Sequence, residues 1–169
     1  LNTGAATGYD NYLSGVPKGL IRHAYDTIKK QSPSVLVGLV TEPVWANHDE
    51  DERGSYTDAD FSVLYDGNVD TKALMEQGQC DFVAVKAFGS LDDPETPYHS
   101  VTSWWSEVSL KTGVPLFIIH ASDRAVSDAV GWGEYDQLAR QVIVARELTG
   151  YSGSVFNCLT RLVENPKDC

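Results

Sequence analysis

The stretch Val35-Leu-Val-Gly-Leu-Val40 is short, rich in β-branched residues and almost continuously apolar. Such a run predicts a β-strand buried on both faces, as in a parallel sheet, rather than a strand with one apolar face. Three further runs, each bounded by Gly, Pro, Ser or Asp, share this character: 82–85, 115–119 and 154–156. The sequence therefore predicts four strands of one parallel sheet.

Helical patterns precede and separate these strands. Apolar residues recur at spacings of three and four in the segments 20–28, 70–77, 100–111 and 135–149. The first follows Pro17, so residues 1–17 are expected to form a loop or arm before it, and glycines at 78, 113 and 150 are expected to end the other three. Alternation of helix and strand is typical of right-handed βαβ units, and the predicted fold class is α/β.

The composition is that of one globular domain. The chain has 169 residues, of which 42% are hydrophobic and 22% charged, enough for one core but not for two ordinary domains. Its formal net charge of −11 disfavours nucleic acid and anionic membrane surfaces as partners, because both would repel it. No apolar run approaches the roughly 18–20 residues of a membrane span.

Several common chemistries lack their sequence signatures. The sequence has neither a phosphate-binding glycine loop nor a dinucleotide fingerprint, and no G-x-S-x-G or H-E-x-x-H motif. We therefore expect no cofactor. The cysteines form no C-x-x-C pair, which argues against a zinc site. Buried free thiols at Cys80 and Cys158 are favoured over a disulfide between them, and Cys169 is expected to be exposed.

Polar residues follow each predicted strand. They are Glu42, Lys86, His120 with Asp123 three residues later, and Asn157. The carboxyl ends of parallel strands meet at one edge of the sheet, where binding and catalytic residues gather in parallel α/β folds. Glycoside hydrolysis needs two carboxyl groups across the scissile bond, and Glu42 and Asp123 are the candidates here. No metal site is expected among these residues.

Each candidate also has a purely structural interpretation. Glu42 and Lys86 would then form an ion pair with each other, and His120 would be a hydrogen-bonded core histidine. Asp123 would belong to a loop turn with a local ion pair to Arg124. The acidic run 49–52 predicts a solvated loop; a calcium site is the alternative, although the EF-type spacing is absent.

Aromatic residues in the long loops are candidate sugar platforms. The loops after the first and third strands, residues 41–66 and 122–134, carry Trp45 and Trp132, whose exposed rings could stack on a sugar face. The pair Trp104-Trp105 lies in a predicted helix and is instead expected to pack in the core.

Several segments, taken in order, resemble glycosyl-hydrolase-like family 10, a family of bacterial glycosidase-like proteins. They are Val37-Gly-Leu-Val-Thr-Glu-Pro-Val-Trp-Ala-Asn47, Tyr65 to Gly78, Cys80-Asp-Phe-Val-Ala84, Tyr98 with Trp104-Trp105, Phe117-Ile-Ile-His-Ala121 with Arg124, and then Trp132, Gln141, Arg146 and Gly153-Ser-Val-Phe156. The resemblance runs from about Ile21 to Asn165, and the order and spacing of the segments follow the family.

That family has a (β/α)8 barrel fold, and the matched region is its second half. The resemblance implies that residues 1–169 form a single partial barrel domain containing strands five to eight. The family's acidic segment at the end of strand four has no counterpart in this chain. Lys86 stands where the family has glutamine and Glu42 where it has an aromatic residue, which leaves room for a distinct sugar specificity.

Two hypotheses follow from the residues and the resemblance. In the first, the chain is part of an extracytoplasmic bacterial glycoside hydrolase that acts on an envelope or plant polysaccharide, and it is inactive alone. In the second, it is a non-catalytic carbohydrate-binding or structural module whose Trp45, Phe88 and Trp132 bind sugar without turnover. A half-barrel exposes strand edges and an apolar inner face, so we expect a homodimer or pairing with the other half-barrel.

Overall fold

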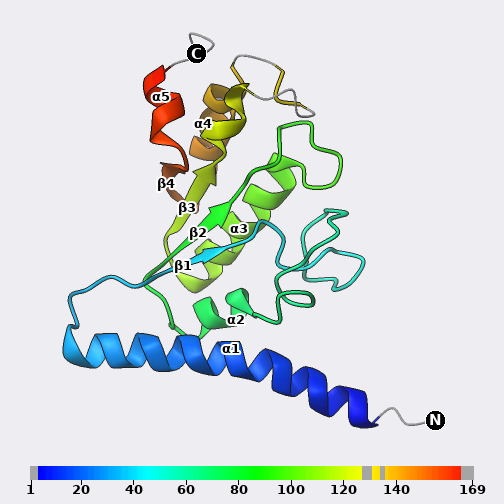
Figure 1. Ribbon diagram of the computed structural model, residues 1–169, viewed down its shortest axis with the longest axis vertical. Helices are drawn as coiled ribbons and strands as arrows, with labels where there is room; N and C mark the ends of the chain where they lie inside the picture. The colour runs from blue at the N-terminus through cyan, green and yellow to red at the C-terminus, as the bar shows by residue number, and fades with distance from the viewer. Residues whose placement is uncertain (1–3, 127–130, 134–135, 165–169) are drawn as a thin grey trace.

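The computed structural model describes residues 4–126, 131–133 and 136–164 (Figure 1). Within them, one sheet contains the strands β1 (Gly38–Thr41), β2 (Phe82–Lys86), β3 (Leu116–His120) and β4 (Tyr151–Phe156). The strands lie in the order β1-β2-β3-β4, and each neighbouring pair is parallel. The predicted parallel α/β arrangement is confirmed, and every strand overlaps its predicted segment.

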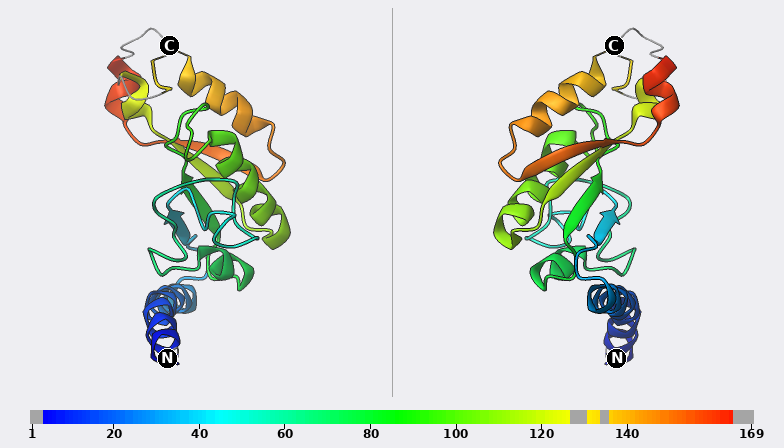
Figure 2. Two further views of the ribbon diagram at one scale, coloured as in Figure 1. Left: turned by 90° about the vertical axis from the view of Figure 1, so that its right-hand side faces the viewer. Right: turned by 90° about the vertical axis from the view of Figure 1, so that its left-hand side faces the viewer.

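Helices precede, connect and follow these strands in the described part of the chain. They are α1 (Gly4–Gln31), α2 (Thr71–Glu76), α3 (Tyr98–Thr112), α4 (Gln137–Arg146) and α5 (Leu159–Glu164), with a 3-10 turn, η1, at Ser122–Val126. Figure 2 shows α2, α3 and α4 on the same side of the sheet. Strands in sequential order with their connecting helices on one side are typical of (β/α)8 barrels, because doubly wound sheets carry helices on both faces.

The N-terminal segment differs from its prediction. The expected loop or arm is wrong for residues 4–17, because α1 is helical from Gly4 and contains Pro17 in its interior, and residues 1–3 lie outside the described ones. Proline lacks the N–H that a helix interior needs and disfavours the helical conformation of the preceding residue. These two effects made Pro17 look like a helix start in the sequence.

The C-terminal part of α1 is tied to the sheet by Asp81. This carboxylate accepts hydrogen bonds from the Tyr25 hydroxyl (3.2 Å) and the Val37 amide (2.6 Å), and it pairs with the Lys29 ammonium at 2.6 Å. The hydrogen bond from Lys29, followed by that from Val37, lowers the pKa of Asp81. One carboxylate at the start of β2 therefore joins α1 and the segment before β1.

Two of the three predicted helix-ending glycines have the expected conformation. Gly78 follows α2 with φ of +64°, and Gly113 ends α3 with φ of +72°. Gly150 serves another purpose: α4 ends earlier, at Arg146, and a Cβ on Gly150 would lie 2.6 Å from the Ser106 carbonyl oxygen. It is glycine because α3 passes close to the chain there. Tyr135, the predicted start of this helix, lies outside the described residues.

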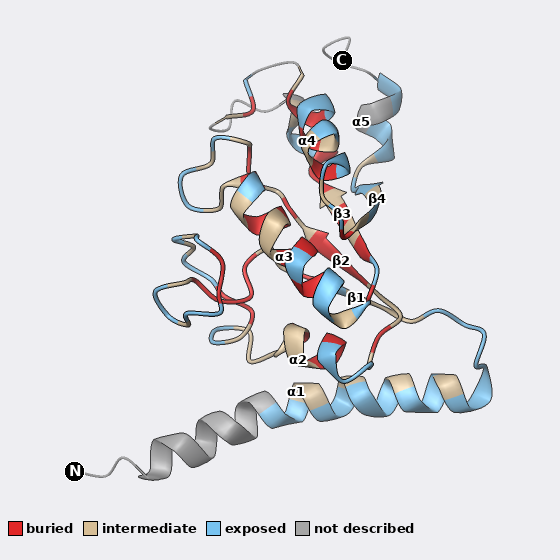
Figure 3. Ribbon diagram, turned by 180° about the vertical axis from the view of Figure 1, so that it is seen from behind, coloured by how far each residue is buried: buried red, intermediate tan, exposed pale blue. Residues whose placement is uncertain are grey.

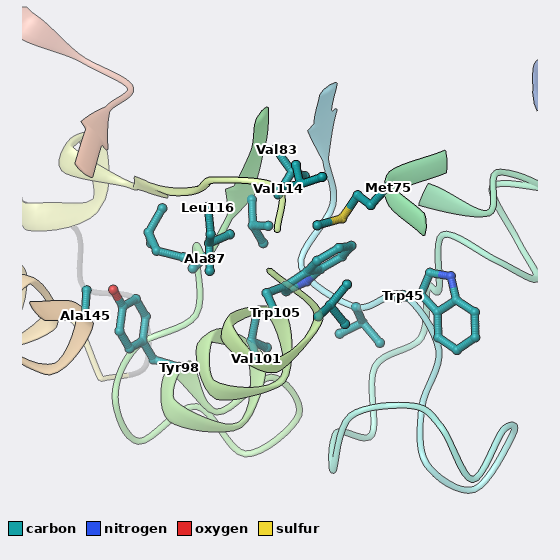
Figure 4. Close-up of a cluster of buried hydrophobic side chains, with 14 of the residues drawn as sticks. Trp45, Met75, Val83, Ala87, Tyr98, Val101, Trp105, Val114, Leu116 and Ala145 are labelled. Carbon is teal, nitrogen blue, oxygen red and sulfur yellow. The ribbon is translucent and has the colours of Figure 1, made fainter. Parts of the chain in front are cut away.

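The hydrophobic core lies between the sheet and α3 (Figures 3 and 4). Val83, Val85, Leu116 and Ile118 point from the central strands towards the helices and are completely buried. Trp105 packs against them from α3, is itself completely buried, and donates from Nε1 to the Pro43 carbonyl at 2.7 Å. The expected core position of Trp105 is confirmed.

The opposite side of the sheet, which we call the open face, consists of apolar residues without a covering layer in the described part of the chain. Phe82 and Phe117 meet edge to face at 5.5 Å there, while Val40 and Val155 are 63% and 42% exposed. The rings lie over glycines: a Cβ on Gly38 would overlap Phe82, and one on Gly153 would lie 3.0 Å from Phe117. The prediction of strands buried on both faces is thus fulfilled on the helix side only.

The described cysteines, Cys80 and Cys158, are free, which confirms the preference for free thiols over a disulfide. Cys80 is buried as expected, and burial raises the pKa of its thiol to about 11, whereas Cys158 is only partly buried. Cys169 lies outside the described residues. No helix in the described ranges is long and apolar enough to cross a membrane.

The helix-side core should dominate the stability of the chain. Leu116→Ala is expected to lower the free energy of unfolding by about 2–5 kcal/mol, because it removes a completely buried side chain and leaves a cavity. Leu110→Ala, at a position on α3 that is 55% exposed, is the matched control and should change it by about 0.5 kcal/mol or less. Urea unfolding followed by circular dichroism measures both; equal losses would contradict this account of the core.

Candidate active site

The pleat of the strands sends the predicted site residues to two different sides of the sheet. Val83 and Val85 face the helices, so Ala84 and Lys86 point to the open face. The register pairs Thr41 with Val85, which places the next residue of each chain segment, Glu42 and Lys86, side by side. The carboxyl ends of β1 and β2 therefore bring a carboxylate and an ammonium together at the edge of the open face.

Glu42 and Lys86 form an ion pair across this edge. The Lys86 Nζ donates to the Glu42 Oε1 at 2.5 Å, and the two side chains are 36% and 44% exposed, respectively. This confirms the structural interpretation of both residues as partners. Their exposure leaves both groups accessible to a ligand, so the ion pair positions the carboxylate without burying it.

Asp123 and Asn157 form a second polar group, from the ends of β3 and β4. The Asn157 Nδ2 donates to the Asp123 Oδ1 at 2.8 Å, and the Ser122 hydroxyl donates to the Asn157 Oδ1 at 3.1 Å. The Asn157 backbone amide donates to the His120 carbonyl at 3.2 Å. Asp123 is exposed in η1, so its carboxylate is oriented by an amide and open to solvent. Together, Glu42, Lys86, Asp123 and Asn157 form what we call the rim.

Arg124 links the rim to the neighbouring loop. Its Nη1 donates to the Phe88 carbonyl at 3.0 Å, which holds the loop after β2 against the end of β3. Phe88 is itself partly buried. The loop that carries this predicted sugar contact is therefore anchored at the rim.

His120 does not reach the rim. It lies on the helix side of β3, is completely buried, and is hydrogen-bonded at both ring nitrogens. Its Nδ1 is 3.2 Å from the Gln141 Oε1 on α4, and its Nε2 is 2.7 Å from the Ser154 hydroxyl on β4. The expected position of His120 at the rim is wrong. His120 lies two residues after Ile118 on β3, so both side chains point towards the helices, whereas that of Ile119 points to the open face. The structural interpretation, a satisfied core histidine, is confirmed.

The hydrogen-bond partners of His120 also fix its tautomer. Gln141 donates through Nε2 to the Gly89 carbonyl at 2.9 Å, so its Oε1 is the atom that faces His120 and accepts from Nδ1. The other nitrogen, Nε2, then accepts from the Ser154 hydroxyl, which in turn contacts the Tyr151 hydroxyl at 2.7 Å. We assign the proton from these partners. The network joins β3, β4, α4 and the loop after β2.

The two predicted sugar platforms are buried. Trp45 and Trp132 are each 1% exposed, so the expectation of exposed rings is wrong for both. Trp45 stacks on Trp104 at 5.6 Å and donates from Nε1 to Asp70 at 3.0 Å. Trp132 packs in a small cluster with Ala121, Leu138, Phe88 and Ala125. The loop after β1 thus adds Trp45 to the main core, whereas the loop after β3 forms a small core of its own around Trp132.

Asn47 organises the long loop after β1, a role that sequence analysis missed. Its Oδ1 accepts from the Ala59 amide (3.0 Å) and the Thr57 hydroxyl (2.9 Å), and its Nδ2 donates to the Ala59 carbonyl at 2.9 Å. Asparagine commonly forms such side-chain-to-backbone contacts in turns, which is the one signal the sequence offered.

The acidic run 49–52 is a solvated loop, as expected: Asp49, Glu50 and Glu52 are exposed. Asp51 pairs with Arg53 at 2.6 Å, and the hydrogen bond from Arg53 lowers the pKa of Asp51 to about 2. Glu50 accepts from the Asn47 amide at 3.0 Å. In the described ranges, no group of three or more His, Cys, Asp or Glu side chains is placed to hold a metal ion.

The buried state of His120 should make stability depend on pH. Burial lowers its pKa in the folded chain, whereas an unfolded histidine titrates near ~6.5. The unfolded chain therefore binds more protons than the folded one below that pH, and the free energy of unfolding should fall as the pH drops through ~6.5. Urea titrations at about pH 7.5 and 5.5 should show this loss in the free energy of unfolding. The loss should be smaller in His120→Asn and unchanged in His99→Asn, a control at an exposed histidine. An unchanged loss in His120→Asn would contradict the assignment.

Comparison with known proteins finds similarity to part of two proteins that are named glycosyl hydrolases. No family model matches the chain. Over 163 residues, 96% of this chain and 32% of the relative, it is 28% identical to the glycosyl hydrolase YngK of Bacillus subtilis. Over 100 residues, 59% of this chain and 22% of the relative, it is 31% identical to the glycosyl hydrolase DigH of Escherichia coli K12. The chain thus spans about a third or less of these curated relatives, and it is similar to one part of proteins named glycosyl hydrolases.

Proposed function

We propose that this chain provides strands five to eight of a (β/α)8-barrel glycoside hydrolase and that its rim forms one side of the active site. Three observations support the proposal: the sequential strand order, the apolar open face, and the similarity to proteins named glycosyl hydrolases. Four further strands that continue the sheet from its edge strands, β1 and β4, and close it into a barrel would bury residues such as Val40 and Val155, as a barrel interior requires.

The Glu42–Lys86 ion pair is the observation that carries the proposal. It lies on the open-face side of the carboxyl ends of β1 and β2. If the open face becomes a barrel interior, this pair points into the barrel mouth, where active sites of such barrels lie. A charged pair in that position is poorly explained by stability alone, because an exposed ion pair contributes only about 0–1 kcal/mol.

The rim can supply one of the two carboxyl groups that glycoside hydrolysis needs. One group acts as an acid and donates a proton to the leaving oxygen, and the other attacks the sugar or activates a water molecule. Glu42 is held by Lys86 and Asp123 by Asn157, so each carboxylate has a defined direction. In the proposed enzyme either one works with an acid from the other half of the barrel, and Phe88 and Asn157 contact the sugar.

The substrate class and the location belong to the proposal as well. We propose a polysaccharide of the bacterial envelope or of plants, and an extracytoplasmic bacterial enzyme. The resemblance of the sequence to bacterial glycosidase-like proteins supports this choice. Neither a homodimer nor pairing with a separate half-barrel is needed if strands one to four belong to the same polypeptide.

The roles of the two carboxylates can be separated from folding and from sugar binding. In the polypeptide that carries this chain, Glu42→Gln or Asp123→Asn should lower kcat by about 100-fold or more if the residue is the acid, base or nucleophile. The oligosaccharide affinity should change little, because each substitution keeps shape and polarity. Reducing-sugar release and calorimetric titration with the same substrate measure the two quantities.

The matched control is Glu147→Gln, an exposed carboxylate at the C-terminal end of α4, which should leave kcat unchanged. Normal turnover in both rim variants would contradict their catalytic role. Binding without turnover in the parent protein would favour the alternative, a carbohydrate-binding module. Hydrolysis by residues 1–169 alone would refute the half-barrel proposal, since that proposal places a necessary acid outside this chain.

A further inference from the structure

A groove of about 580 Å³ lies on the helix side of the molecule, between the loop after β1 and the helices α2 and α3. This is within the range of small-ligand sites, roughly 300–1,000 Å³. Its lining includes His48, Glu52, Tyr56, His99, Ser103 and Trp104. None of the rim residues lines it, so the groove is separate from the proposed active site.

One wall of the groove is held in place by a tryptophan pair. Trp104 stacks on the buried Trp45 with an interplanar angle of 16°, and it donates from Nε1 to the Arg53 carbonyl at 2.7 Å. On the loop side, the His48 amide donates to the Ser55 carbonyl at 2.8 Å. Contacts from the loop to α3 and within the loop therefore preform the groove, so a ligand would not have to order it.

One aromatic side chain in this lining is open to a ligand. Tyr56 is 75% exposed, and its ring centroid lies 4.3 Å from that of His48. The Nδ1 of His48 is shielded from solvent and has no hydrogen-bond partner in the described structure, so the His48 ring supports Tyr56 and does not present Nδ1 to the groove. The Tyr56 ring is thus an exposed aromatic face that packs against the ring behind it.

The charges around the groove argue against an anionic ligand. Its cationic side chains are engaged by nearby carboxylates: Lys72 by Glu76 at 2.6 Å, Lys111 by Glu107 at 3.4 Å, and Arg53 by Asp51 at 2.6 Å. Glu52 adds an exposed carboxylate. A neutral ligand with many hydroxyl groups fits this surface better, because carboxylate and imidazole groups bind hydroxyls and an aromatic ring packs against the C–H face of a sugar.

We propose that this groove is a second carbohydrate site, which binds a neutral oligosaccharide without cleaving it. The Tyr56 ring packs against a sugar ring, while the exposed Glu52 carboxylate hydrogen-bonds to sugar hydroxyls. Ser103 and His99 offer further polar contacts from α3. The site requires no hydrolytic activity, so it stands or falls independently of the proposed function.

The test is calorimetric titration of the full chain with four neutral hexasaccharides: β-1,4-linked glucose, xylose and N-acetylglucosamine, and α-1,4-linked glucose. At least one is expected to bind. Tyr56→Ala should weaken that binding about tenfold or more, a loss of about 1.4 kcal/mol. Glu52→Gln and His48→Ala should weaken it as well, and thermal unfolding verifies that each variant is folded.

The matched aromatic control is Phe61→Ala, an exposed residue of the same loop that does not line the groove; it should keep the affinity within about twofold. Binding of none of the four sugars would overturn the proposal. So would binding that survives Tyr56→Ala but is lost in Asn157→Ala, because that result places the sugar at the rim. Binding that is lost in Tyr56→Ala and kept in Asn157→Ala would support the groove site.

Discussion

The structure depends on one constraint of its sheet: the connecting helices α2, α3 and α4 all lie on the same side of it. Right-handed crossovers that always return on one side give the strands two chemically different faces. The helix side holds a dense core around Trp105, whereas Phe82 and Phe117 are left on the open face. Burial of apolar area is the main force for folding. Further strands that enclose the uncovered apolar face of this sheet would therefore be strongly stabilising.

The alternation of side chains along each strand then decides which polar residues can take part in chemistry. Lys86 and His120 are both the last residues of their strands, yet Lys86 points to the open face and His120 to the helices. The two residues therefore have different roles. His120 holds α4, β4 and the loop after β2 together, and the ion pair of Glu42 with Lys86 remains accessible at the edge of the sheet.

Much of the fold was predictable from the sequence, because buried parallel strands are short continuous apolar runs and glycines mark the ends of helices. Which end of the sheet carries the polar residues also followed from strand order. The side to which His120 points did not, because it depends on the register between strands, and a shift of one residue reverses it. The burial of Trp45 and Trp132 was equally hidden, since it arises from loops that fold back onto helices distant in sequence.

The glycines of the open face have an effect beyond their own positions. Gly38 and Gly153 give Phe82 and Phe117 room to lie directly over the neighbouring strand, where a Cβ would meet their rings. A larger residue at either position would raise a phenyl ring and turn a shallow surface into a ridged one. Two residues that contribute no side chain therefore set the surface shape of this face. Any covering layer of side chains must match that shape.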